Sequence, residues 1–186
     1  MKKLLLPFLI LFSQISFSQS TLRTADNCDC RCYINSSFTW DGDCKDGYCD
    51  GWGTIKLKTR VYTGNVIKGV FSGFGTVYQV YYGSLTKEYE GEWRNNELTG
   101  KAKYYYPNGR ILYDGEVTEG KFNGYGKLFD KNEGIIYEGN FYNIDPYSGK
   151  NYCLYGNPQD GSCLIIWINS HSFDITTYKG EMRNGY

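Results

Sequence analysis

The stretch YDGEVTEGKFNGYGK, residues 113–127, places four glycines at fixed distances after a tyrosine. The same frame, aromatic-x-Gly-x4-Gly-x3-Gly-x-Gly, occurs in WDGDCKDGYCDGWGT (40–54), YTGNVIKGVFSGFGT (62–76) and YEGEWRNNELTGKAK (89–103), where Asn96 and Ala102 replace two glycines. A fifth copy begins at Tyr137 and then degenerates, and a sixth begins at Tyr178. The first five copies start 22 to 27 residues apart, a period typical of repeat arrays in which each unit stacks on its neighbours.

Each copy predicts a β-hairpin around a two-residue turn. Asp46-Gly47, Asn95-Asn96 and Asn184-Gly185 occupy the same frame position and suit a type I′ turn, which needs positive φ at both residues. Lys68-Gly69 and Glu119-Gly120 suit the first turn position less well. The chain has 23 glycines, 19 tyrosines, 4 prolines and few long apolar periodic runs, so short strands and tight turns are expected.

The turn centre also predicts which residues face each other across a hairpin. With the turn at 46–47, Cys44 faces Cys49 and Trp40 faces Gly53. An aromatic ring over a bare strand glycine is a recurring device in sheets, so these residue types need no binding site to explain them. The same rule pairs Gly42 with Gly51, Tyr62 with Gly75, Tyr89 with Ala102 and Tyr113 with Gly126.

Alternation of side chains along a strand defines a packed face. This face contains Trp40, Cys44 and Cys49 and, in the other copies, the apolar pairs Val66–Phe71, Trp93–Leu98 and Val117–Phe122. The two cysteines replace such a pair at a non-hydrogen-bonded position, where Cα atoms come within disulfide range. We therefore predict a Cys44–Cys49 disulfide that staples the first hairpin.

The in-frame copies resemble the MORN repeat, and the resemblance covers most of the chain after its leader. It implies an all-β fold in which β-hairpins stack into one elongated, single-layer, twisted antiparallel sheet. It also implies scaffolding, membrane-apposed or protein-binding roles rather than a common chemistry. Plant lipid kinases that carry such repeats have a separate kinase domain. No segment fits such a domain here, so kinase activity is not expected.

The N-terminal segment MKKLLLPFLILFSQISFS (1–18) is typical of a signal peptide, with a charged start, an apolar run too short to span a bilayer and small residues near its end. We expect an exported protein, secreted or held in the periplasm or cell envelope, similar to bacterial-type MORN proteins. Without Lys2 and Lys3, 18 basic and 20 acidic residues remain, a net charge near −2. Such a charge argues against nucleic acid as a partner.

All seven cysteines follow the leader, and export makes disulfides the default. Cys28, Cys30 and Cys32 form the segment CDCRC. Three thiols can hold a metal, but a structural zinc site takes four ligands. We expect disulfides from this segment to the first hairpins or to a partner chain, so that 19–39 forms an N-terminal cap of a repeat array at 40–186. Because seven is odd, at least one cysteine stays unpaired or bonds to another chain.

Two further cysteines, Cys153 and Cys163, bracket LYGNPQDGS, a turn-rich segment that replaces the second arm of the fifth copy. A disulfide that closes this 153–163 loop is predicted, and it would stabilise the fold by roughly 2–3 kcal/mol on a loop-entropy estimate. A Cys–His nucleophile with His171 is the alternative, although no nucleophile motif accompanies it. LIIWI (164–168) and FDITTY (173–178) predict two strands.

The acidic first turn invites a calcium-loop interpretation. An EF-hand that starts at Asp41 needs Asp or Asn at the fifth position, Gly at the sixth and Glu at the twelfth, but the chain has Lys45, Asp46 and Trp52 there. No metal or other cofactor is therefore expected. A solvated acidic surface is favoured over an ad hoc cation site for three carboxylates of the outer face: Asp41, Asp43 and Asp50.

Between the last two frame glycines, the outer face carries Trp52, Phe74, Lys101 and Tyr125. Successive positions lie about 10 Å apart, which is twice the strand spacing. These rings either pack against neighbouring side chains of a curved sheet or form a stripe that binds a protein, a glycan or a membrane surface, since exposed apolar patches mark contacts. We expect a non-enzymatic scaffold or binding module without catalytic residues.

The alternative function is an extracytoplasmic, glycan-active hydrolase. Glu90 and Glu92 share the outer face, but paired catalytic carboxylates need a fixed separation in a cleft, and a single-layer array offers no obvious pocket. One further expectation concerns the incomplete last repeat, 178–186, whose returning arm is missing. Either the sequence is a fragment of a longer array, or strand 177–183 is an open sheet edge. We expect the chain either to self-associate through this edge or to be less stable than a version extended by one arm.

Overall fold

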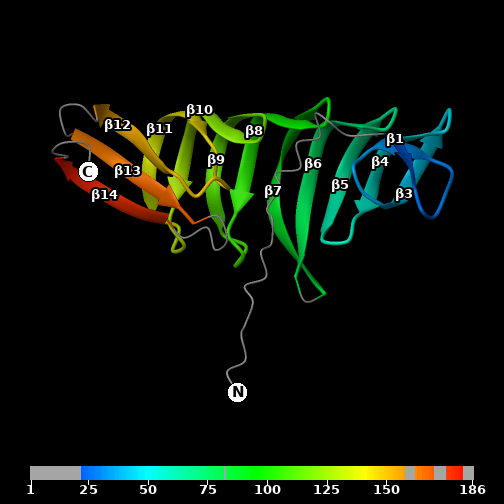
Figure 1. The fold of residues 1–186 in the computed structure, drawn as a ribbon, viewed down its shortest axis with the longest axis horizontal. Coiled ribbons are helices and arrows are strands. Elements are labelled where there is room, and N and C mark those ends of the chain that lie inside the picture. Colours follow the sequence, from blue (N-terminus) through cyan, green and yellow to red (C-terminus); the bar gives the residue numbers. More distant parts are fainter. Residues whose placement is uncertain (1–21, 82, 158–161, 170–174, 182–186) are drawn as a thin grey trace, which may run out of the picture.

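The computed structural model describes residues 22–81, 83–157, 162–169 and 175–181, which contain fourteen strands and no helix. In this part of the chain no helix is therefore long or apolar enough to cross a membrane. The strands lie side by side along the long axis of an elongated molecule (Figure 1). Three features of the sequence lie outside the described residues: the expected signal peptide (1–18), the turn expected at Asn184-Gly185 and His171.

Eleven strands form one large sheet, in which each strand from β3 to β11 pairs antiparallel with the next. The predicted all-β architecture of stacked hairpins is confirmed. The strands are β1 (Leu22–Thr24), β2 (Arg31–Tyr33), β3 (Thr39–Lys45), β4 (Tyr48–Lys56), β5 (Arg60–Ile67), β6 (Val70–Tyr81), β7 (Ser84–Arg94), β8 (Glu97–Tyr105), β9 (Ile111–Thr118), β10 (Lys121–Phe129) and β11 (Ile135–Ile144).

The turns of the first four hairpins have positive φ at both residues, as predicted. This holds for Asp46-Gly47 (52° and 75°) and Asn95-Asn96 (52° and 66°). It also holds where the first residue is unusual for such a turn, since Lys68 has φ 50° and Glu119 has φ 51°. The two-residue spacing between paired strands therefore overrides the local preference of these two side chains.

The predicted register is wrong by two residues beyond each turn. Tyr62 lies opposite Val77 instead of Gly75, and Trp40 lies opposite Ile55 instead of Gly53. The cause is a β-bulge, in which the second strand carries two more residues than the first. In the second hairpin, the first strand has one residue between the pairs Gly64↔Gly75 and Val66↔Phe71, whereas the second strand has three. The third frame glycine opens this bulge in each of the first four copies with positive φ: Gly51 (87°), Gly73 (71°), Gly100 (77°) and Gly124 (113°). The remaining opposite pairs are Gly42↔Gly53, Tyr89↔Tyr104 and Tyr113↔Leu128.

The rings nevertheless cover the predicted glycines. A Cβ atom on Gly75 would lie 2.5 Å from the ring of Tyr62, and one on Gly126 would lie 2.5 Å from the hydroxyl of Tyr113. The polar tips of four frame aromatics donate to the carbonyl three residues later: Trp40 to Asp43 (2.9 Å), Tyr62 to Asn65 (2.9 Å), Tyr113 to Glu116 (2.7 Å) and Tyr137 to Asn140 (3.2 Å). The frame therefore selects tyrosine or tryptophan rather than phenylalanine.

The third copy shows what a methyl group does at the covered position. Ala102 stands there, opposite Gly91, and the ring of Tyr89 stacks on Tyr104 at 5.3 Å between centroids. The ring cannot occupy the space that Tyr62 and Tyr113 fill in their own hairpins. The substitution of one glycine therefore accounts for the different tyrosine position.

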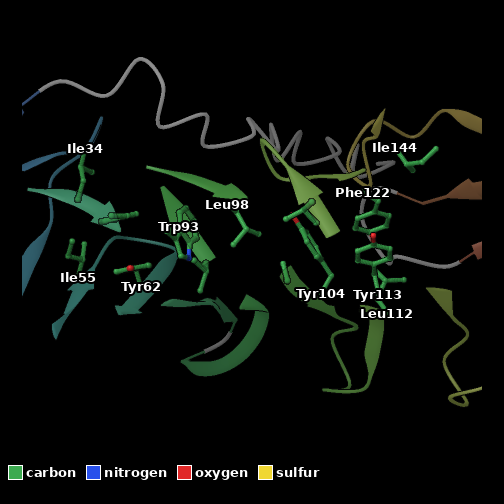
Figure 2. Packing of buried hydrophobic residues seen from close by; sticks show 14 of the residues in the cluster. Ile34, Ile55, Tyr62, Trp93, Leu98, Tyr104, Leu112, Tyr113, Phe122 and Ile144 are labelled. Atoms are coloured by element: carbon green, nitrogen blue, oxygen red, sulfur yellow. The ribbon is translucent and has the colours of Figure 1, made fainter. Parts of the chain in front are cut away.

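Aromatic side chains fill the packed face in a row along the sheet (Figure 2). Tyr62 stacks on Phe71 (4.0 Å) and meets the edge of Trp93 (5.5 Å). Tyr113 repeats this arrangement, with Phe122 at 3.8 Å and Phe141 at 5.0 Å. The apolar pairs predicted for this face are buried, each residue being at most 4% exposed: Val66–Phe71, Trp93–Leu98 and Val117–Phe122.

Neighbouring hairpins are also joined through their turns. The second residue of each turn donates its backbone N–H to the preceding hairpin. The acceptor is the carbonyl of the second residue after that hairpin's turn. These bonds are Gly69 to Cys49 (2.8 Å), Asn96 to Phe71 (3.2 Å) and Gly120 to Leu98 (2.9 Å). They hold successive repeats in one alignment along the edge of the sheet.

The first hairpin carries two disulfides, Cys30–Cys44 and Cys32–Cys49, with Cα atoms 5.6 and 5.8 Å apart. The predicted Cys44–Cys49 bond is therefore wrong, although these two residues do face each other across β3 and β4. Strand β2 lies against the hairpin, where Arg31 pairs with Tyr48. Cys30, just before this strand, bonds to Cys44, and Cys32 within it bonds to Cys49. The expectation that CDCRC forms disulfides with the first hairpin is confirmed, while Cys28 is free and half-buried.

The C-terminal part forms a second, three-stranded antiparallel sheet of β12 (Asn151–Asn157), β13 (Ser162–Ile168) and β14 (Ile175–Glu181). The two strands predicted from LIIWI and FDITTY are present, but 154–157 belongs to β12 rather than to a loop. Leu154, Leu164, Ile166 and Ile168 are buried in the same core as the large sheet. Cys153 is disulfide-bonded, whereas the side chain of its predicted partner Cys163 lies outside the described part.

A hydrogen bond to a buried ion pair ties the segment after β11 to the middle of the sheet. A register shift between Val77 and Tyr78 gives β7 an extra residue, Glu88, which is 5% exposed. Its carboxylate accepts two hydrogen bonds from the guanidinium of Arg60, both 2.9 Å, and one from the hydroxyl of Tyr147 at 3.1 Å. Burial and the nearby Glu88 carboxylate raise the pKa of Tyr147 well above its ordinary value. The pair therefore links β5, β7 and the chain that leads into the second sheet.

Candidate functional site

The outer face of the large sheet presents the predicted aromatic positions to solvent. Trp52 is 60% exposed, Phe74 51% and Tyr125 53%. Each follows a bulge glycine on the second strand of its hairpin, and Lys101 takes the same place on β8. We call Trp52, Phe74, Lys101 and Tyr125, with their cross-strand partners, the outer row.

The cross-strand partners in the outer row are polar. Trp52 lies opposite Asn65, Phe74 opposite Glu92, Lys101 opposite Glu116 and Tyr125 opposite Asn140. A ring or lysine on every second strand thus alternates with an amide or carboxylate on the strand between. The row crosses the sheet from β4 to β11, and its large side chains repeat about every 10 Å, two strand spacings.

Two carboxylates of the row also support the bulges. Glu116 accepts a hydrogen bond from the backbone N–H of Tyr125 at 3.0 Å. The carboxylate of Glu92 lies above Gly100, where a Cβ atom would be 2.6 Å from its Oε2. The sequence contains a signal for this role that was missed, because the residue after the first frame glycine is always Asp, Asn or Glu: Asp43, Asn65, Glu92, Glu116 and Asn140.

The ring of Tyr125 is fixed at its far end, where its hydroxyl donates to Glu138 at 2.9 Å. Trp52 and Phe74 have no hydrogen-bonded or ring partner among the described residues. If these rings packed against neighbouring side chains, which was the first of the two alternatives, they would be largely buried. Instead, each ring is more than half exposed. The structure places the predicted residues in one row. At one of the four equivalent positions the charged Lys101 replaces an aromatic ring.

A ladder of alternating charges runs beside the outer row. The sheet register aligns Glu90, Lys103, Asp114, Lys127 and Glu138 on successive strands. Lys103 contacts Asp114 at 3.2 Å and Lys127 contacts Glu138 at 3.0 Å. Each charge therefore meets an opposite charge on a neighbouring strand, so this part of the face carries little net charge.

Both carboxylates of the alternative hydrolase are engaged by neighbouring groups. Glu90 accepts hydrogen bonds from Lys87 (2.8 Å) and from the hydroxyl of Tyr105. Burial raises the pKa of Glu90, but the two hydrogen bonds and the positive charges of Lys87 and Lys103 together outweigh it, and the net shift is downward. Glu92 covers its bulge. No observation in the described residues points to a catalytic pair.

Metal binding finds no geometric support in the described part of the chain. No group of three or more His, Cys, Asp or Glu side chains there is arranged to hold an ion. Asp50, one of the outer acidic residues, accepts a hydrogen bond from the backbone N–H of Lys68 at 2.9 Å. This carboxylate thus has a role in aligning the first two hairpins.

Comparison with known proteins gives one family. Residues 89–109 and 113–134 match the MORN repeat, and these segments cover β8, β10 and most of the residues of β7 and β9. No curated protein matches the chain. The resemblance seen in the sequence is confirmed for these two adjacent repeats, which are of a kind that generally serves in binding and scaffolding.

Proposed function

Starting from the two MORN repeats, we propose that the chain is a non-enzymatic binding module whose contact surface is the outer row. The observation that carries the proposal is the exposure of Trp52, Phe74 and Tyr125 in one register across the sheet. Exposed large apolar side chains grouped on one surface mark contacts with other molecules. The partner classes are a protein, a glycan and a membrane surface.

The fold suits this role because it holds the row rigidly. The turn-to-turn hydrogen bonds and the packed aromatic face fix each hairpin against the next. A preorganised surface loses little conformational entropy when a ligand binds. The two disulfides of the cap are typical of an oxidising, extracytoplasmic environment. We place the protein outside the cytoplasm, secreted or in the cell envelope.

The test is co-sedimentation of the purified chain with the insoluble envelope fraction of the cells that express it. We expect the wild type to sediment and the triple variant Trp52→Ala, Phe74→Ala, Tyr125→Ala to stay in the supernatant. The matched control is Leu85→Ala, because Leu85 is 57% exposed but lies on the β6–β7 hairpin outside the row. Equal sedimentation of the wild type and the triple variant would refute the proposal, provided that their thermal unfolding agrees.

A further inference from the structure

We propose that the ligand of the outer row is a single chain of an uncharged, β-linked polysaccharide that lies across the strands, along the long axis of the sheet. This inference rests on the proposed function and specifies the ligand of the same surface. It follows from three properties of the surface: the spacing of the rings in the row, the polar groups between them and the paired charges of the neighbouring ladder.

The spacing matches a repeating ligand. The rings of Trp52 and Phe74 are two strands apart, about 10 Å, and the span from Trp52 on β4 to Tyr125 on β10 is about 29 Å. In an extended β-linked glucan of the cellulose type, successive sugars are turned over, so that every second ring presents the same face. Two sugars of such a chain extend about as far as two strands. Each aromatic position therefore meets an equivalent sugar face.

The polar groups of the row match the edges of the sugars. The C–H face of a pyranose is apolar and stacks on an aromatic ring, while its hydroxyls project sideways and need hydrogen-bond partners. Asn65, Glu92, Glu116 and Asn140 lie opposite the large side chains of the row and supply amide and carboxylate groups in these places. The bond from the Tyr125 hydroxyl to Glu138 fixes one ring in position for stacking.

The charges of the face favour a neutral ligand. Along the neighbouring ladder, Lys103 pairs with Asp114 and Lys127 pairs with Glu138. A polyanion or an anionic membrane would find no net positive surface there, whereas hydroxyl groups can donate to carboxylates and accept from lysines. An uncharged polyhydroxylated chain is therefore complementary to this part of the face.

Two features refine the ligand. Adjacent strands rotate by about 20–25°, so rings two strands apart rotate by about 40–50°. A flat crystalline polysaccharide could then contact only neighbouring rings, but a single chain can twist with the sheet. Lys101 interrupts the series of rings on β8. Its replacement by an aromatic side chain would complete the row.

The experiment is electrophoresis of the full chain in native gels that contain hydroxyethylcellulose, with dextran as the α-linked comparison. We expect hydroxyethylcellulose to retard the wild type and dextran not to do so. Trp52→Ala, Phe74→Ala and Tyr125→Ala should each weaken the affinity between about twofold and tenfold, the range that one aromatic stacking contact supports. Lys101→Trp should strengthen it, and Leu85→Ala should leave it unchanged.

The outcomes separate this inference from the proposed function. Equal mobility in gels with and without hydroxyethylcellulose would overturn the polysaccharide inference, as would row-dependent binding to phosphatidylcholine vesicles or loss of envelope binding after protease treatment of the envelope. In each case, co-sedimentation that still depends on the three rings would leave the proposed function standing. If the three alanine variants bind hydroxyethylcellulose more weakly but Lys101→Trp does not bind it more strongly, the proposed stacking geometry is wrong.

Discussion

Gly126→Ala is expected to destabilise the protein by about 2 kcal/mol, because the new methyl group would enter the space of the Tyr113 ring. The Cβ atom would lie 2.5 Å from the Tyr113 hydroxyl oxygen. If the ring yields, it loses its hydrogen bond to Glu116, worth about 1 kcal/mol, and two ring contacts of about 0.5–1.5 kcal/mol each. If the ring stays, the overpacked methyl group costs about 1–3 kcal/mol. The cheaper response decides the loss, which is therefore about 1–3 kcal/mol.

Urea unfolding followed by circular dichroism measures this loss. The control is Gly134→Ala, whose Cβ atom would meet only the end of the Asp130 side chain, and we expect it to cost less than about 1 kcal/mol. Tyr113→Phe should cost about 1 kcal/mol in the wild type and much less in the Gly126→Ala background, because the ring is already displaced there. Equal urea midpoints for the two glycine variants, or full additivity of Tyr113→Phe and Gly126→Ala, would refute the covering role of the tyrosine.

Peptide mapping without reduction is expected to recover Cys30–Cys44 and Cys32–Cys49 and to find Cys28 alkylated; a Cys44–Cys49 peptide would contradict the role of β2. Glu88→Gln should destabilise the fold by about 2–4 kcal/mol, since it leaves the guanidinium of Arg60 without its buried counter-charge; a shift in urea midpoint no larger than that of Gly134→Ala would count against it. Burial raises the pKa of the core tyrosines, so their phenolates form only in the unfolded chain, and stability should fall as the pH rises above about 10. Phenolate absorbance should then appear together with the loss of circular dichroism, and an earlier, non-cooperative rise would speak against buried hydroxyls. In the described residues β14 pairs only with β13, so light scattering at rising concentration should reveal self-association; a monomer at high concentration would disprove this use of the edge.

The turns and the packed face could be predicted because both depend on neighbouring residues. Two adjacent positions with positive φ and the alternation of side chains are local properties, and Val66 and Phe71 lie opposite each other as expected. The register beyond the turn could not be predicted in the same way. Gly51 and its equivalents were assigned no backbone role, although a glycine at a fixed place in every copy is also the signal of a bulge.

The disulfides and the second sheet depend on contacts between distant segments. The opposition of Cys44 and Cys49 is correct, but the path of β2 decides their partners, and nothing in CDCRC states where that strand lies. The role of Glu88 also depends on a distant segment, since its partner Tyr147 is 59 residues away. The outer row was predicted because it follows from the frame alone. Its charge ladder was missed because it appears only when the register is known.

The covalent cap gives the array a direction. The two disulfides close segments of 14 and 17 residues at the N-terminal end, so the first hairpin is locked as soon as about fifty residues have left the translocation or synthesis machinery. Each later hairpin then has a finished edge on which to form. A chain that emerges vectorially can thus fold in the order in which it appears, and mechanical pulling on its two ends should peel hairpins away from the C-terminal side first.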